Sequence, residues 1–185
     1  MQDHILEIKK FFPEAVCEKI LLYFENYLED AKVTNDDNPI QKNIRNCQTT
    51  HLLHRETTFG AKLLLQFIRK EIFKATKVYE DKFKYFSVNK INQIDLLKYD
   101  SNAFDVGYKF HVDQGTNASD RTVSVSICLN NKFEGGEFVF SVNGKEVVYP
   151  QNIGDLLLFP SNFMFPHQVN KVTKGTRYAL ISWLI

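Results

Sequence analysis

The spacing of apolar residues changes character about halfway along the chain. In the first half, apolar residues recur at the three- and four-residue spacing of helices in two segments. One helix is expected from Pro13 to about Glu29, after a short strand within residues 5–12, and a second from Thr58 to Val78. Residues 32–46 are rich in Asn, Asp and Lys and lack periodicity, which predicts a long loop.

From Val88 onward, short apolar segments alternate with turn residues. Asn143-Gly144 is the clearest turn, since this pair suits the type I′ turn of a β-hairpin. The pattern predicts a mainly β fold with flanking helices, a jelly roll or double-sheet barrel with two N-terminal helices packed on one sheet. We expect one domain over residues 1–185, with a helical support region at 1–87 and a jelly-roll core at 88–185. Eight strands are expected, over residues 94–99, 108–113, 122–129, 137–141, 145–149, 155–159, 165–172 and 177–184.

The segment from Thr122 to Leu129 has two distinct faces. Val123, Val125, Ile127 and Leu129 form an aliphatic face suited to the helices, and the alternate residues are small and mildly polar. The small face would look into the barrel and leave room for a polar ligand. Strand pattern alone equally allows a one-sided strand whose small face meets water.

Composition and charge narrow the class of protein. With 185 residues, 44% hydrophobic and 24% charged, the chain suits one globular domain. A net charge of +1 without charge runs argues against nucleic acid as a partner. The chain shows no signal-like start and no apolar run of membrane length, so a soluble cytoplasmic protein is expected. Three cysteines without C-x-x-C spacing predict reduced thiols.

One set of residues suggests a metal-binding site. His111 and Asp113 are two positions apart, so a strand directs both side chains to one face. His167 would complete two histidines and one carboxylate, the set that covers one face of an octahedral Fe(II) and leaves the other positions open. Arg177 opens the last predicted strand, where its guanidinium could grip a carboxylate bidentately.

From about Ile94 to Trp183 the chain resembles the iron(II) and 2-oxoglutarate-dependent dioxygenases, in particular the prolyl 4-hydroxylase branch. Their double-stranded β-helix, a cupin-like jelly roll, agrees with the predicted strands. The opening residues 8–17 also resemble the entry into the first helix of that branch. The matching stretches are Leu97-Lys-Tyr99, Gly107 to Asp113, Arg121 to Asn130, Glu134-Gly-Gly-Glu137, Gly154-Asp155 with its apolar strand, Pro166-His167, Gly175 to Tyr178 and Trp183.

The resemblance implies roles for individual residues. It assigns His111, Asp113 and His167 to iron, Arg177 to the distal carboxylate of 2-oxoglutarate, and the Tyr99 hydroxyl to the same cosubstrate. It also implies O2 as the second cosubstrate, succinate and CO2 as products, and ascorbate as a candidate reductant. We list Ser124, Ser126 and Cys128 as candidate pocket-lining residues, with Cys128 standing where some relatives place a second tyrosine.

The substrate is left open by the sequence, as are the oligomeric state and a role in oxygen sensing. By analogy we expect hydroxylation of a peptide or protein side chain, with proline the first choice. The loops 32–57 and 100–106 could fold over such a peptide. The alternatives are a free amino acid or other small molecule, and a cupin-like module that binds metal without turnover. For the remaining residues we expect surface histidines at His4, His51 and His54, packing at Tyr178 and Trp183, and pocket wall or core at Tyr108. As alternatives, His51 and His54 could edge a substrate groove, and Trp183 could lie near the substrate.

Overall fold

The computed structural model describes residues 2–32, 40–53, 55, 57–115 and 118–185. Its helices are two short 3-10 helices, η1 (Gln2–His4) and η2 (Glu25–Tyr27), and two α-helices, α1 (Glu14–Phe24) and α2 (Phe59–Lys82). Its strands are β1 (Leu6–Ile8), β2 (Glu29–Asp30), β3 (Arg45–Asn46), β4 (Gln48–His51), β5 (Ile91–Asp100), β6 (Gly107–His111), β7 (Val123–Cys128), β8 (Phe133–Gly135), β9 (Phe138–Val142), β10 (Lys145–Tyr149), β11 (Leu156–Pro160), β12 (His167–Val169) and β13 (Val172–Leu184).

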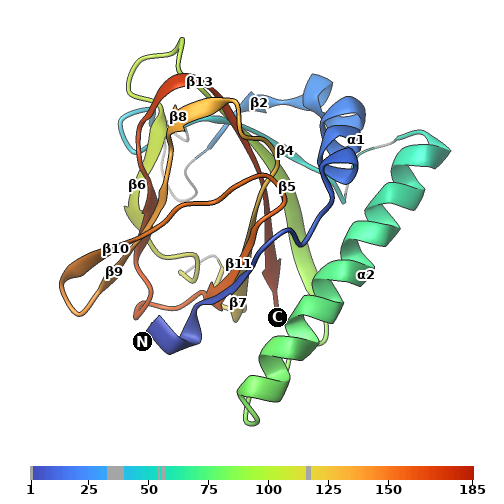
Figure 1. Cartoon of the computed structure of the whole chain (residues 1–185), viewed down its shortest axis with the longest axis vertical. Helices are drawn as coiled ribbons and strands as arrows, with labels where there is room; N and C mark the ends of the chain where they lie inside the picture. Colours follow the sequence, from blue (N-terminus) through green and yellow to red (C-terminus); the bar gives the residue numbers. More distant parts are fainter. Residues whose placement is uncertain (1, 33–39, 54, 56, 116–117) are drawn as a thin grey trace.

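The described strands form two antiparallel sheets that face each other (Figure 1). The larger sheet has the order β1-β11-β7-β13-β5-β4-β2, with β8 pairing onto β13. The smaller sheet has the order β10-β9-β12-β6-β3. Apart from the hairpin of β9 and β10, neighbouring strands are far apart in sequence, which is typical of a jelly roll. The prediction of a mainly β, double-sheet fold is therefore confirmed.

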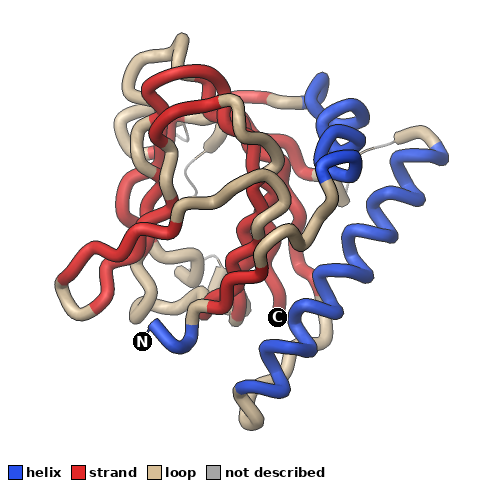
Figure 2. Tube along the Cα trace, in the orientation of Figure 1, coloured by secondary structure: helices blue, strands red, loops and turns tan. Residues whose placement is uncertain are grey.

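Apolar residues are divided between two cores. One core joins buried residues of α1 and α2, such as Ile20 and Ile68, to the aliphatic face of β7, including Val125 and Ile127. Figure 2 shows the two α-helices together on one side of the strands. The other core contains Phe138, Phe140, Phe159 and further apolar residues of both sheets. Within the described residues, no helix combines the length and apolar character needed to cross a membrane.

The hairpin between β9 and β10 has the predicted turn. Val142 pairs with Lys145, so Asn143 and Gly144 are the two turn residues. Their φ angles are +53° and +73°, and a type I′ turn requires positive φ at both positions. Asn and Gly tolerate this backbone conformation better than other residues, which explains why these two residues alone were enough to predict the turn.

The structure also corrects several sequence-based boundaries. β2, β3 and β4 lie in the region expected to contain only helices and a loop, and β8 was not predicted. β3 pairs with β6, and β4 pairs with β5, so this region extends both sheets. β6 ends at His111, which leaves Asp113 two residues beyond the strand.

The start of α2 gives a direct test of the fold. The Thr58 hydroxyl accepts a hydrogen bond from the Ala61 backbone N–H at 3.3 Å, which satisfies one donor at the helix end. Thr58→Ala should lower the free energy of unfolding by about 1 kcal/mol in urea denaturation. Thr57→Ala, one residue before the cap, is the matched control and should have a smaller effect. Equal effects of the two substitutions would contradict the capping role.

Candidate metal centre and adjoining groove

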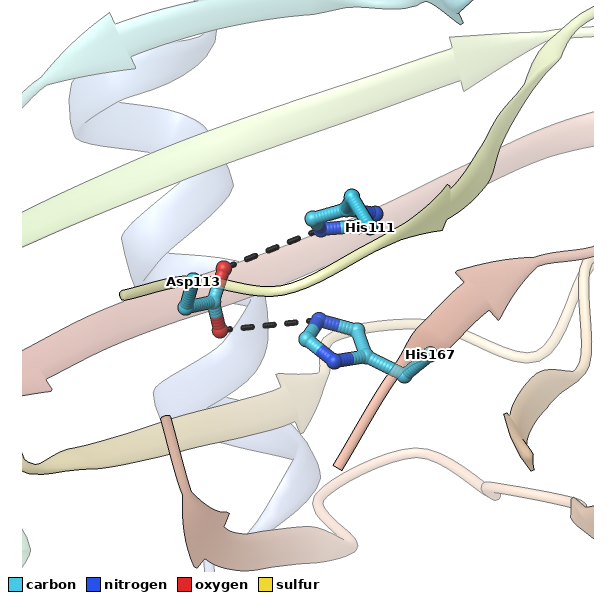
Figure 3. Close-up of side chains that lie close together, drawn as sticks. All are labelled: His111, Asp113 and His167. Atoms are coloured by element: carbon cyan, nitrogen blue, oxygen red, sulfur yellow. Dashed lines mark ion pairs between the residues drawn. The ribbon is translucent and has the colours of Figure 1, made fainter. Parts of the chain in front are cut away.

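The two candidate histidine ligands face each other across neighbouring strands. His111 ends β6, His167 begins β12, and the two residues are register partners in the smaller sheet. Asp113 lies just past the end of β6, and Figure 3 shows one of its carboxylate oxygens directed at each imidazole ring. His167 and Asp113 are buried, and His111 is partly buried. The pairing of β6 with β12 thus brings together side chains that are up to 56 positions apart in the sequence.

Hydrogen bonds to the backbone fix the orientation of both imidazoles. His111 Nδ1 lies 2.8 Å from the Lys109 carbonyl oxygen, and His167 Nδ1 lies 3.0 Å from the Phe165 carbonyl oxygen. A carbonyl only accepts, so each Nδ1 carries the proton and donates. Each Nε2 is then left with its lone pair, which is the arrangement needed for metal ligation.

The free lone pairs are turned toward the carboxylate of Asp113. The Nε2 atom of His111 is 3.7 Å from Asp113 Oδ1, and that of His167 is 3.5 Å from Oδ2. Both distances exceed those of normal hydrogen bonds. Ligand atoms of the three residues all lie within 4.8 Å of one another. Two imidazoles and one carboxylate with this convergence fit the facial set that binds Fe(II).

The expected protonation states also suit a metal. Burial tends to raise the pKa of Asp113, but the imidazoles of His167 and His111 and the Ser124 hydrogen bond lower it below its usual range. Burial lowers the pKa of His167 to about 4, against the attraction of Asp113. At neutral pH the carboxylate is therefore ionised and His167 is neutral, the forms that bind metal ions.

Ser124 holds the carboxylate of Asp113 in place. Its hydroxyl on β7 donates to Asp113 Oδ2 at 2.6 Å and lies 2.8 Å from the Ser161 hydroxyl oxygen. We predicted Ser124 as a lining residue of the cosubstrate pocket; the structure instead places it behind a candidate metal ligand. Such supporting hydrogen bonds orient ligands and tune their basicity.

This contact predicts a defect in metal affinity. Ser124→Ala should weaken binding of Fe(II), or of Mn(II) as a stable substitute, by about tenfold, since the carboxylate loses its orienting donor. The measurement is a metal titration of the folded protein. Ser182→Ala is a suitable control, because the Ser182 hydroxyl donates to the Gln93 carbonyl oxygen and not to a candidate ligand. Unchanged metal affinity in Ser124→Ala would show that Asp113 is held by other contacts.

A cavity adjoins the three residues inside the barrel. Tyr99, Tyr108 and Ser126 contribute to its wall together with His111, Asp113 and His167. Burial raises the pKa of Tyr99, so its phenol remains protonated and able to donate at neutral pH. Cys128 does not line this cavity as predicted. Its thiol donates to the Asn130 carbonyl oxygen at 3.1 Å, and all three cysteines are free and buried.

Arg177 lies behind this cavity and does not line it. It is the register partner of Tyr99 on the neighbouring strand, and its guanidinium carbon lies 5.6 Å from the centre of the Tyr99 ring. The residue is only 1% exposed. Gly136 has a positive φ of +69°, and a Cβ there would come within 2.8 Å of Arg177 Cδ. The glycine therefore makes space for the arginine stem.

A wider groove opens over the candidate ligands. Its wall includes residues of β3 and β4 as well as Arg121 and Trp183, and its volume is about 690 Å³. Among the described residues, four buried side-chain atoms lack a hydrogen-bond partner, and all four belong to groove-lining residues: Arg45 Nε, Thr49 Oγ1, Arg121 Nε and Trp183 Nε1. Buried polar atoms without partners are costly, so these four atoms are candidates for contacts with polar groups of a ligand or with water.

The structure also shows where the remaining residues considered in the sequence lie relative to this groove. His51 lines the groove, as the alternative role had it, and its Nδ1 contacts Asp95 while the side chain stays partly exposed. His54 lies outside the described residues. Tyr108 lines both the cavity and the groove. Trp183 also lines both, with the Arg121 guanidinium carbon 3.7 Å from its ring centre, whereas Tyr178 belongs to the core on the helix side. Arg45 and Thr49 were not predicted, since neither stands in a local motif, and Arg121 was noted only as the first residue of a stretch that resembles the family.

Comparison with known proteins shows which family this chain resembles. The model of the 2OG-Fe(II) oxygenase superfamily matches residues 95–185. A PKHD-type hydroxylase of Colwellia psychrerythraea is 30% identical over 84 residues, 42% of this chain and 37% of that relative. One from Prochlorococcus marinus is 28% identical over 135 residues, 71% of this chain and 56% of the relative. The chain thus spans about a third to just over half of the length of these relatives.

Solved structures show the same fold at low sequence identity. A prolyl hydroxylase from Trichoplax adhaerens, in complex with a hypoxia inducible factor peptide fragment, has a TM-score of 0.81 and 19% identity, covering 98% of this chain and 83% of that one. A Pseudomonas putida prolyl-4-hydroxylase has a TM-score of 0.72 and 16% identity, covering 98% and 91%. The predicted resemblance to the 2OG-Fe(II) oxygenases of prolyl hydroxylase type is therefore confirmed: the family model matches residues 95–185, and the solved structures share the fold.

Proposed function

We propose that the chain is an Fe(II)- and 2-oxoglutarate-dependent oxygenase that hydroxylates an unactivated C–H bond. The observation that carries this proposal is the convergence of His111, Asp113 and His167, with both Nε2 lone pairs turned toward one carboxylate. These residues would hold Fe(II) by one face. When bound, the iron with 2-oxoglutarate and O2 supplies hydroxylation chemistry that releases succinate and CO2.

Arg177 and Tyr99 are the proposed anchors for 2-oxoglutarate. A fully buried guanidinium is costly unless an anion meets it, and no described carboxylate lies within ion-pair distance of Arg177. Tyr99 lines the cavity on the side of Arg177 and offers a protonated phenol. Binding of 2-oxoglutarate then requires the cavity to extend past Tyr99 to the guanidinium. Ser126 is the proposed wall residue, and Cys128 remains a prediction for the same pocket.

A peptide or protein is the proposed substrate, with a prolyl residue as the site of hydroxylation. The groove over the ligands has the size of a typical binding site, and its unpartnered Arg45 Nε, Arg121 Nε and Trp183 Nε1 are donors. A peptide backbone offers carbonyl acceptors at regular spacing. One structural neighbour was solved with a peptide. A free amino acid or another small molecule is the alternative substrate.

We also propose that two parts of the single domain have different roles. Residues 88–185 contain the candidate ligands, Tyr99 and Arg177, and form most of both sheets. Residues 1–87 support the larger sheet through α1 and α2. They also contribute Arg45 and His51 to the groove.

Succinate formation is the decisive test of the proposed function. The protein is incubated with Fe(II), ascorbate and 2-oxoglutarate, with and without a set of proline-containing peptides, and succinate is measured. Iron-dependent succinate supports the oxygenase, and a peptide mass gain of one oxygen identifies the substrate class. If no iron-dependent succinate forms under either condition, the alternative of a metal-binding module without turnover is favoured. Omission of ascorbate tests its predicted role as reductant.

A further inference from the structure

The loop between β10 and β11 carries an amide whose orientation is fixed by its neighbours. Gln151 Nε2 lies 3.2 Å from the Ser126 carbonyl oxygen and 3.3 Å from the Asp155 carbonyl oxygen. Both partners only accept, so this atom must be the amide nitrogen. The oxygen of the same amide is thereby forced to point the other way.

That oxygen meets the buried guanidinium. Arg177 Nη2 donates to Gln151 Oε1 at 3.1 Å, and the Ser126 hydroxyl lies 3.5 Å from the same oxygen. The guanidinium carbon is also 5.6 Å from the ring centre of Tyr99 and 5.9 Å from that of Phe133. Gln151 is therefore a polar group that fixes where one arm of the Arg177 fork lies.

A neutral acceptor has a particular consequence for a buried cation. An amide oxygen can orient the guanidinium by a hydrogen bond without neutralising its charge. A carboxylate at the same place would form an ion pair and compete with any incoming anion. Within the described part of the chain, no Asp or Glu side chain stands within 4.0 Å of the Arg177 nitrogens. The positive charge of Arg177 thus remains available for a ligand.

We propose that Gln151 is a positioning residue for 2-oxoglutarate: its amide, locked by two backbone carbonyls, aims the Arg177 guanidinium at the distal carboxylate while leaving its charge unpaired. This inference rests on the proposed function, because it assumes that Arg177 binds that carboxylate. Gln151 itself acts through Arg177 and does not contact a reacting atom.

Binding measurements separate this role from a general effect on the fold. The protein is loaded with Mn(II) and titrated calorimetrically with 2-oxoglutarate and, separately, with oxalate. Oxalate can chelate a metal but has no distal carboxylate, so it reports on the metal end alone. The variants are Gln151→Met, which keeps the length but removes the acceptor, and Gln151→Glu, which adds a competing charge. Asn152→Ala is the matched control, since Asn152 lies in the same loop and its amide contacts Asp155.

The expected result is a selective loss of 2-oxoglutarate affinity. Gln151→Met should bind 2-oxoglutarate about tenfold more weakly, the effect of one hydrogen bond to a charged group. Gln151→Glu should bind it roughly 100-fold more weakly, because the new carboxylate pairs with Arg177. Oxalate affinity should change by less than about twofold in both variants, and Asn152→Ala should match the wild type for both ligands.

The outcomes distinguish a failure of the positioning role of Gln151 from a failure of the proposed function. If both variants bind 2-oxoglutarate as the wild type does, or lose oxalate and 2-oxoglutarate affinity equally, the positioning role is overturned. If the wild type binds oxalate but not 2-oxoglutarate, the proposed function itself fails. Circular dichroism checks that each variant is folded; if Gln151→Met is not, Gln151→Glu decides the question alone.

Discussion

Replacing Asp113 by alanine is expected to abolish iron-dependent succinate formation. The substitution removes the single carboxylate that faces both imidazoles, and it deprives the Ser124 hydroxyl of its acceptor. Loss of a supporting group alone typically changes metal affinity or activity by 10- to 100-fold, so the loss of a ligand should cost more than about 100-fold. The measurement is succinate release at saturating 2-oxoglutarate, together with an Fe(II) titration.

Two further variants show whether the effect is specific to the site. His111→Ala should lose activity in the same way, because His111 Nε2 faces the same carboxylate. Asp120→Ala removes an exposed carboxylate from the loop that follows and should retain activity. Full activity of His111→Ala would show that iron is not held at this place.

Arg177→Ala is expected to act on the requirement for 2-oxoglutarate more than on the maximal rate. Removal of a buried charged partner typically costs about 2–5 kcal/mol of binding, so half-maximal succinate formation should need about 100-fold more 2-oxoglutarate or beyond. Arg177→Lys should be intermediate, since lysine keeps the charge but not the planar fork. The dependence of succinate release on 2-oxoglutarate gives the half-saturating concentration and the maximal rate separately.

The stability of the variant must be followed in the same experiment, because Arg177 is buried and packs beside Tyr99 and Phe133. Arg69→Ala, on the exposed side of α2, is the control for the loss of a positive charge alone. If folded Arg177→Ala loses rate at every 2-oxoglutarate concentration while its half-saturating concentration is unchanged, Arg177 does not bind the cosubstrate.

Sequence patterns predicted the residues of the candidate metal centre better than they predicted its surroundings. His111 and Asp113 stand next to a strand with a clear pattern, and their spacing alone suggested a shared direction. The register of His167 with His111 could not be predicted, because the pairing of β6 with β12 depends on the sheet order of the whole barrel. His167 was a candidate third ligand on residue type alone, and the resemblance to a family supported it.

The sequence suggested that residues 32–57 could lie over a peptide, but the strands that form this wall of the groove could not be predicted from it. β2 and β3 have two residues each, too few to show alternation, and β4 has four. Their extended form depends on pairing with β4, β5 and β6, which lie elsewhere in the chain. Gln151 was likewise missed, since it belongs to no motif and its importance comes from the approach of Arg177.

The position of β3 and β4 has a consequence for how such proteins diverge. The family match over residues 95–185 includes the candidate ligands, Tyr99 and Arg177, but not Arg45, Thr49 or His51, which help to line the groove. Under the proposed function, β3 and β4 thus add one wall to a groove whose remaining wall, including Arg121 and Trp183, lies in the matched stretch. Sequence changes in β3 and β4 would then alter that one wall of the groove while leaving the candidate ligands in place.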